Sequence, residues 1–162
     1  MGSKAGRKMG NKMGSKHAQG LTLLELMIAL AVLGILSIIA VPIFNKYGDT
    51  ARMTKANHHY QQAIKLVRTK QVENSTAISM GAPSLAPESS EKWIEAFGTS
   101  DEAPGGGPAY IPNLLGDSLT GAIGIESLPD GRFSVAVTRP AYLSLEAFQA
   151  TVNGGKVVET KI

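Results

Sequence analysis

Glu25 has the most unusual chemical setting in the sequence, because it is the only charged residue between Leu21 and Phe44. An acid inside a membrane helix costs about 2.5 kcal/mol or more by insertion scales, so such acids are usually paired or functional. A cut between Gly20 and Leu21 would create a positive amino terminus four residues from Glu25, on the same helical face. A helix start also favours an anion. The spacing therefore predicts a charge pair that proteolysis creates. The alternative is an ordinary single-span anchor with Glu25 at the membrane interface.

Other residues that could catalyse a reaction or bind a ligand form no convincing site. His58 and His59 are adjacent, so on a helix their side chains point about 100° apart and cannot chelate one metal; we predict surface histidines. Asp117 and Asp130 are candidate calcium ligands, but scattered acids are usually solvated. The glycine-rich run 104–108 lacks the Lys of a phosphate-binding loop, and no Gly-x-Ser-x-Gly motif occurs. We expect no catalytic, cofactor-binding or metal site, and no cofactor.

The apolar segment that carries Glu25 is long enough to cross a bilayer. Residues 21–44 would span about 36 Å as a helix, against about 30 Å of hydrocarbon. A cleaved secretory signal has a shorter apolar run that ends in small residues. The best such cut here follows Ile38-Ile39-Ala40, which places a bulky Ile where a small residue is needed. The sequence therefore favours a membrane helix over a secretory signal.

The charge of the chain is unevenly distributed. The formal net charge is +3, but residues 1–20 contain five basic and no acidic side chains, which leaves 11 basic and 13 acidic ones in the rest. The body therefore gives no support for direct nucleic-acid binding, which needs a clustered basic face. By the positive-inside rule the leader stays in the cytoplasm. The chain has no Cys, so disulfides and thiolate metal sites are excluded.

The segment that begins Gly20-Leu21-Thr22-Leu23-Leu24-Glu25 strongly resembles the amino-terminal segment of type IV pilins and type II secretion pseudopilins. The family pattern is a short basic leader, Gly at the cleavage point, an apolar first mature residue, then Thr, and Glu in fifth place. The resemblance continues through Phe44, and beyond Tyr47 it is only architectural.

The resemblance implies a role for each matching residue. Gly20 would precede the cut by prepilin peptidase, and Leu21 would become the N-methylated first residue, where many members have Phe. Thr22 would place a hydroxyl near the junction. Glu25 would neutralise the amino terminus of a neighbouring subunit during assembly.

Gly34 and Pro42 match further family positions. Pro42 removes a helical hydrogen bond and Gly34 lowers helix propensity, so bending is easiest between them. In related filaments this part of the helix unwinds; the alternative is a membrane helix that tolerates both residues. The leader is longer than many family leaders, and translation could begin at Met1, Met9 or Met13.

The rest of the sequence, together with the apolar segment, predicts an α+β, pilin-like fold. In this fold one long N-terminal helix spans the membrane with its first half and packs on a small antiparallel sheet. Five apolar residues recur at helical spacing and form a stripe, which predicts that one face of the helix packs against a core. Its members are Ala56, Tyr60, Ala63, Ile64 and Val67.

We also expect a short helix at 89–97 that carries Trp93, and strands at 122–128 and 132–138 around the turn Pro129-Asp130-Gly131. A short helix at 144–152 and a final strand at 156–162 complete the chain. Family members often close a C-terminal loop with a disulfide, which this chain cannot form.

These expectations define four regions. They are a cleaved basic leader (1–20), a transmembrane and filament-core helix (21–44), an amphipathic continuation of that helix (45–74), and a globular pilin domain with an αβ-loop and antiparallel sheet (75–162).

The leading hypothesis is a structural subunit of a type IV pilus-like surface filament for adhesion, motility or DNA uptake. The alternatives are a minor pilin or type II secretion pseudopilin, and a membrane-tethered enzyme or binding module. The implied partners are a prepilin peptidase/methyltransferase, copies of the chain and an inner-membrane assembly platform. The implied location is the bacterial inner membrane for the single-pass precursor, then an extracellular pilus or a periplasmic pseudopilus.

Overall fold

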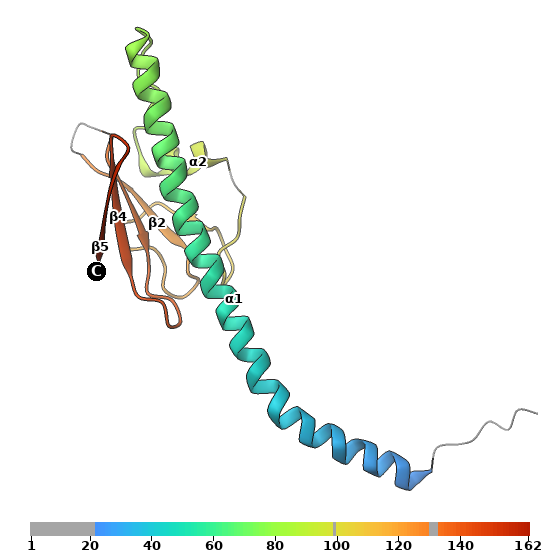
Figure 1. Ribbon diagram of the computed structural model, residues 1–162. Helices are drawn as coiled ribbons and strands as arrows, with labels where there is room; N and C mark the ends of the chain where they lie inside the picture. The colour runs from blue at the N-terminus through green and yellow to red at the C-terminus, as the bar shows by residue number, and fades with distance from the viewer. Residues whose placement is uncertain (1–21, 99, 130–132) are drawn as a thin grey trace, which may run out of the picture. The chain divides into compact units, whose positions relative to one another are not determined.

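The computed structural model describes residues 22–98, 100–129 and 133–162. The chain divides into two compact units, Met1–Val41 and Pro42–Ile162. The helices and strands of the described residues are α1 (Leu23–Ser79), α2 (Ser90–Phe97), β1 (Tyr110–Ile111), β2 (Ile123–Ser127), β3 (Val135–Arg139), β4 (Phe148–Asn153) and β5 (Lys156–Lys161) (Figure 1). This arrangement confirms the predicted α+β class.

In the second unit, α1 packs along one face of the sheet (Figure 1). All five residues of the predicted stripe are buried, because a spacing of three and four residues keeps them on one side of the helix. The helix continues to Ser79 rather than ending at residue 74. It ends in a Schellman motif, in which the N–H of Ala82 bonds Ala77 O and that of Gly81 bonds Ile78 O, both at 2.9 Å. Gly81 has the positive φ of 80° that this motif requires.

The sheet has the order β1-β2-β3-β4-β5. β1 pairs with β2 in parallel, and the other neighbours are antiparallel. The predicted pairing of the strands around residues 129–131 is confirmed, with Ser127 opposite Val135, although residues 130–132 lie outside the described part of the chain. β3 begins at Val135 rather than at residue 132.

The helix predicted at 144–152 is wrong, because residues 148–153 form strand β4. The residues that face α1 alternate along it, with Ala150 and Val152 fully buried. β4 pairs with β3 on one side and β5 on the other, so cross-strand pairing outweighs the local helix propensity. The predicted turn is present, since Gly154 and Gly155 both have positive φ, as a type I′ hairpin needs.

The predicted helix at 89–97 is confirmed as α2. Its N-cap is Ser89, whose side-chain oxygen accepts from the N–H of Lys92, and Gly98 ends it in the left-handed region. Trp93 is fully buried and Phe97 nearly so. Both join the core cluster with α1 and the sheet residues. α2 therefore covers the end of the sheet formed by β1 and β2.

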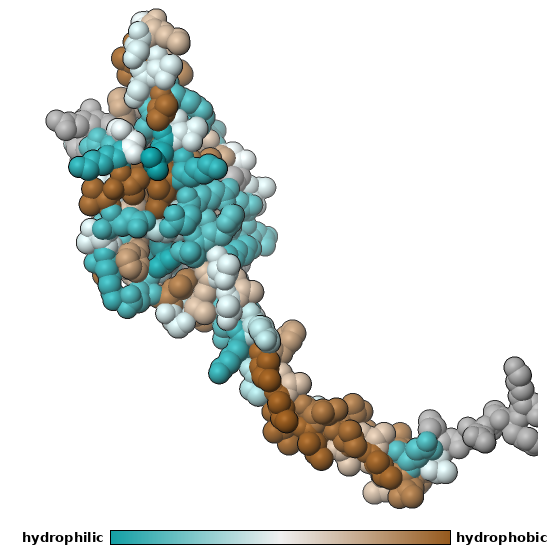
Figure 2. All heavy atoms as spheres, in the orientation of Figure 1, coloured by the Kyte–Doolittle hydropathy of each residue, from teal (hydrophilic) through white to brown (hydrophobic). Residues whose placement is uncertain are grey.

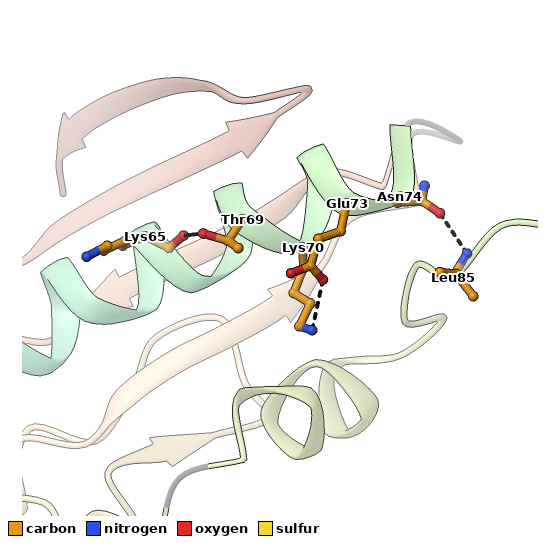
Figure 3. A network of polar contacts seen from close by, with 6 residues as sticks. All are labelled: Lys65, Thr69, Lys70, Glu73, Asn74 and Leu85. Carbon is orange, nitrogen blue, oxygen red and sulfur yellow. Dashed lines mark hydrogen bonds and ion pairs between the residues drawn. The ribbon is translucent and has the colours of Figure 1, made fainter. Parts of the chain in front are cut away.

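Side chains of α1 hold the connecting segments in place. The Gln71 amide donates to Phe133 O at 2.8 Å and to Val152 O at 3.0 Å, and its oxygen accepts from the N–H of Gly155 at 3.0 Å. One turn later, Asn74 Oδ1 accepts from the N–H of Leu85 at 2.7 Å (Figure 3). These contacts fix both the β4–β5 turn and the segment after α1.

Buried Arg139 links the C-terminal strands to α1 without a disulfide. Its guanidinium lies 5.5 Å from the ring centroid of Tyr60 and 5.2 Å from that of Phe148. It donates to Asn57 Oδ1 and, at 3.1 Å, to Glu146 O. Arg139 is therefore held by stacking and by neutral acceptors.

Candidate processing and assembly segment

Thr22 is the N-cap of α1. Its side-chain oxygen accepts a hydrogen bond from the backbone N–H of Glu25 at 3.1 Å, and its carbonyl accepts from the N–H of Leu26 at 3.1 Å. Thr is a favoured N-cap because its hydroxyl satisfies a backbone donor that has no partner within the helix. The helix therefore begins at Leu23, directly after Thr22.

The cap gives Thr22 a role that the sequence analysis missed. Thr22 and Glu25 have the spacing of a capping box, in which Ser or Thr at the N-cap is followed three residues later by Glu or Gln. That signal was available in the sequence. It places Glu25 at the third helical position, where the helix dipole favours an anion.

Gly20 and Leu21 lie outside the described residues. Their roles in cleavage and methylation, and the predicted pairing of the new amino terminus with Glu25, therefore remain predictions. The described geometry concerns Thr22 and Glu25, which the cap brings together at the first turn of α1.

The first part of α1 exposes its whole surface. Residues 22–48 are all exposed, and the large apolar side chains from Leu23 to Phe44 have between 48% and 78% of their surface accessible. Figure 2 shows this stretch as a largely hydrophobic surface, with a small hydrophilic patch at its N-terminal end. By length and composition it could cross a membrane. Because apolar surface of this extent is costly in water, this segment needs lipid or other apolar helices around it.

Gly34 and Pro42 both lie within the continuous helix α1. A Cβ added at Gly34 would have no atom within 4 Å, so no contact within the single chain requires glycine there. Ser37 satisfies its hydroxyl inside the helix by donating to Leu33 O at 2.8 Å. The proposed flexing at Gly34 and Pro42 remains a prediction.

The prediction of two surface histidines is wrong for His59. His58 is exposed, but His59 is only 4% exposed and packs against the ring of Tyr110. The pattern Ala56, His59, Tyr60, Ala63 repeats at helical spacing, so an extension of the apolar stripe by one position could have found it.

Asp117 has a local structural role. Its carboxylate accepts from the N–H of Leu119 at 2.9 Å and from the hydroxyl of Thr120 at 2.7 Å. The hydrogen bond from Thr120, with that from Leu119, lowers the pKa of this carboxyl. The described residues contain no cluster of three side chains suited to a metal, and Asp130 lies outside them.

Residues 15–41 match the family described as the prokaryotic N-terminal methylation motif. The matched segment is the class III prepilin-type leader of type IV pilins and pseudopilins, and it contains the capped start of α1. The match supports membership of the type IV pilin and pseudopilin family, which consists of structural subunits. No solved structure matches the chain.

The motif carries three general implications. It implies processing by a prepilin peptidase and assembly into filaments. With the exposed apolar helix, it also fits a membrane-anchored precursor.

Proposed function

We propose that this chain is the structural subunit of a type IV pilus-like surface filament. The observation that carries the proposal is the position of Glu25. It lies in the capped first turn of α1, at the start of a segment whose large apolar side chains are all exposed, inside the matched methylation motif. An acid there needs a positive partner once the helix is surrounded by apolar groups.

In this proposal, prepilin peptidase cuts after Gly20 and Leu21 is N-methylated. The cut leaves Leu21 one residue before the N-cap, so its amino group adds positive charge to the positive end of the helix dipole. Glu25 opposes that charge within its own helix and neutralises the amino terminus of a neighbouring subunit during assembly. Thr22 supports both steps by fixing where the helix begins.

The precursor would lie in the bacterial inner membrane with its leader in the cytoplasm, and an inner-membrane platform would move it into the filament. The first part of α1 then exchanges lipid for copies of the same helix. The part of the second unit that contains the sheet would remain outside the membrane, on the surface of the filament, for adhesion, motility or DNA uptake.

A minor pilin or a type II secretion pseudopilin would share this capped segment. Abundance separates the alternatives, because a major subunit should dominate sheared surface filaments. A periplasmic pseudopilus subunit should be absent from them.

Mass spectrometry of the mature amino terminus tests the proposal directly. The chain would be expressed with and without prepilin peptidase, and its terminal peptide identified. We expect N-methylated Leu21 only with the peptidase. An intact leader under both conditions, or a cut after Ala40, would contradict the proposal. A peptidase-dependent cut without chains in sheared filaments would favour the pseudopilin alternative.

A further inference from the structure

His59 lies on α1 and is buried against Tyr110, the first residue of β1. Its side chain is 4% exposed, and its ring centroid lies 5.9 Å from that of Tyr110. The Tyr110 hydroxyl donates to His59 O at 3.4 Å. Within the described residues, the buried Nδ1 of His59 has no hydrogen-bond partner. Proton uptake puts an N–H on both ring nitrogens, so it would leave a charged donor there without an acceptor.

The groups that act on His59 come from both sides of this contact. Burial is the largest influence and lowers the pKa of His59; Asp101 opposes it, and Lys55 and His58 on α1 lower it further. Tyr110 is neutral at acidic pH, since the ordinary pKa of tyrosine is 10 and burial raises the pKa of Tyr110 further. The closed contact therefore disfavours the imidazolium.

The contact is linked to α2 through Tyr110. The Phe97 ring packs edge-on against the Tyr110 ring, with centroids 5.3 Å apart. β1 has only two residues. Beside the β1–β2 pairing, the backbone hydrogen bonds that join residues 101–110 to the rest of the described chain are Gly105 N–H to Thr120 O at 2.7 Å and Ile123 N–H to Ala109 O at 2.8 Å. Short segments with few such bonds are the ones that open locally.

We propose that His59 forms a pH-sensitive contact: its neutral ring holds residues 101–110 against α1, and proton uptake releases that segment while the rest of the sheet stays paired. Release would expose the surface of α1 around His59 in acidic surroundings. The proposal depends on the geometry of this contact and is independent of the filament.

The direction of the pH dependence follows from the lowered pKa. A base whose pKa is lower in the closed state binds a proton better once the segment opens. The closed state is therefore fully stable above the ordinary histidine pKa of 6.5 and loses stability as the pH falls below it. One proton raises the opening constant by at most about tenfold per pH unit.

The only Trp in the sequence provides the measurement. Trp93 is fully buried on α2, near the linked Phe97 ring. With the full chain in detergent micelles, we expect its emission to shift to longer wavelength as the pH falls from about 7.5 to 5. Hydrogen exchange, corrected for the intrinsic rate, should accelerate at Gly105 and Ile123, whose amides bond between this segment and the rest of the domain, while the β3–β4 amides stay protected.

His59→Phe keeps an aromatic ring but removes the titration, so it should abolish the transition. The matched control is His58→Gln on the exposed neighbour, which should retain it. A transition that persists in H59F or vanishes in H58Q would overturn the proposal.

A measurement on the unaltered chain covers the case in which H59F fails to fold. The imidazole titration of His59, followed by NMR with ¹³C-labelled histidine, should coincide with the fluorescence midpoint. Midpoints that differ by more than about half a pH unit, or exchange at Ile123 that does not depend on pH after correction, would exclude His59 as the controlling group.

Discussion

The side-chain oxygen of Gln71 accepts a hydrogen bond from the backbone N–H of Gly155 at 3.0 Å, across 84 positions of sequence. The same amide donates to Phe133 O and Val152 O. One buried side chain therefore joins α1 to the end of β4, to the β4–β5 turn and to the segment before β3. It fixes the C-terminal hairpin in a chain that has no cysteine for a disulfide.

Replacing Gln71 with Leu should destabilise the domain strongly. The change would leave an N–H and two carbonyls without this partner; a buried unsatisfied group costs about 1–3 kcal/mol, and the bond to Val152 O is the fully buried one of the three. We expect the free energy of unfolding to fall by at least about 2 kcal/mol, measured by urea denaturation with Trp93 fluorescence. Gln61→Leu, on an exposed position of the same helix, is the matched control and should change stability by less than about 0.5 kcal/mol. Equal effects of the two variants would show that the three hydrogen bonds contribute little.

Loss of the Thr22 hydroxyl should fray the start of α1. Thr22→Val removes the acceptor and keeps the side-chain shape, at an expected cost of about 0.5–2 kcal/mol. We expect faster hydrogen exchange at the amide of Glu25 in micelles. Thr22→Ser retains the hydroxyl and should exchange like the unaltered chain. Unchanged protection in T22V would mean that the helix start does not depend on this cap.

Removal of the Glu25 charge should separate processing from assembly. Glu25→Gln keeps the size of the side chain but cannot neutralise an amino terminus. If the unpaired charge costs about 2.5 kcal/mol, filament yield should fall by more than about tenfold while the leader is still removed. Sheared filaments and the mass of the mature chain measure the two steps. Glu25→Asp, which keeps the charge, should retain more assembly than E25Q, and normal filament yield in E25Q would refute the charge pairing.

Gly34→Ala should have opposite effects on the single chain and on assembly. In the single chain the added Cβ meets nothing within 4 Å, and Ala favours a helix by about 1 kcal/mol over Gly. We therefore expect stronger amide protection around residue 34 in micelles. If the helix must unwind there during packing, filament yield should fall. Ala31→Ser, in the same exposed segment, serves as the control and should leave yield unchanged; normal assembly of G34A would rule out required unwinding at this position.

The sequence predicted features that depend on local period and on short motifs. The buried stripe from Ala56 to Val67 and the cap of α2 at Ser89 follow from helical spacing and capping chemistry. The sequence did not predict β4, because its pairing with β3 and β5 is a tertiary effect that outweighs the helix propensity predicted for residues 144–152.

Burial of polar residues was the other limit of prediction. Gln is a type that is usually exposed, and the position of the C-terminal hairpin, to which Gln71 bonds, explains why it lies inside; the burial of His59 against Tyr110 follows from the helical stripe only if a polar residue is admitted to it. The cap at Thr22 could have been recognised, because its partner Glu25 is three residues away.

β5 forms one edge of the sheet, and its residues are largely exposed. An open edge can template the addition of strands from other molecules, which leads to aggregation. Here Lys156 and Lys161 stand at the two ends of the strand, so antiparallel addition of a second β5 in full register would place lysine opposite lysine. In a filament, where copies of the domain would be crowded together, this repulsion would discourage uncontrolled sheet growth between neighbours.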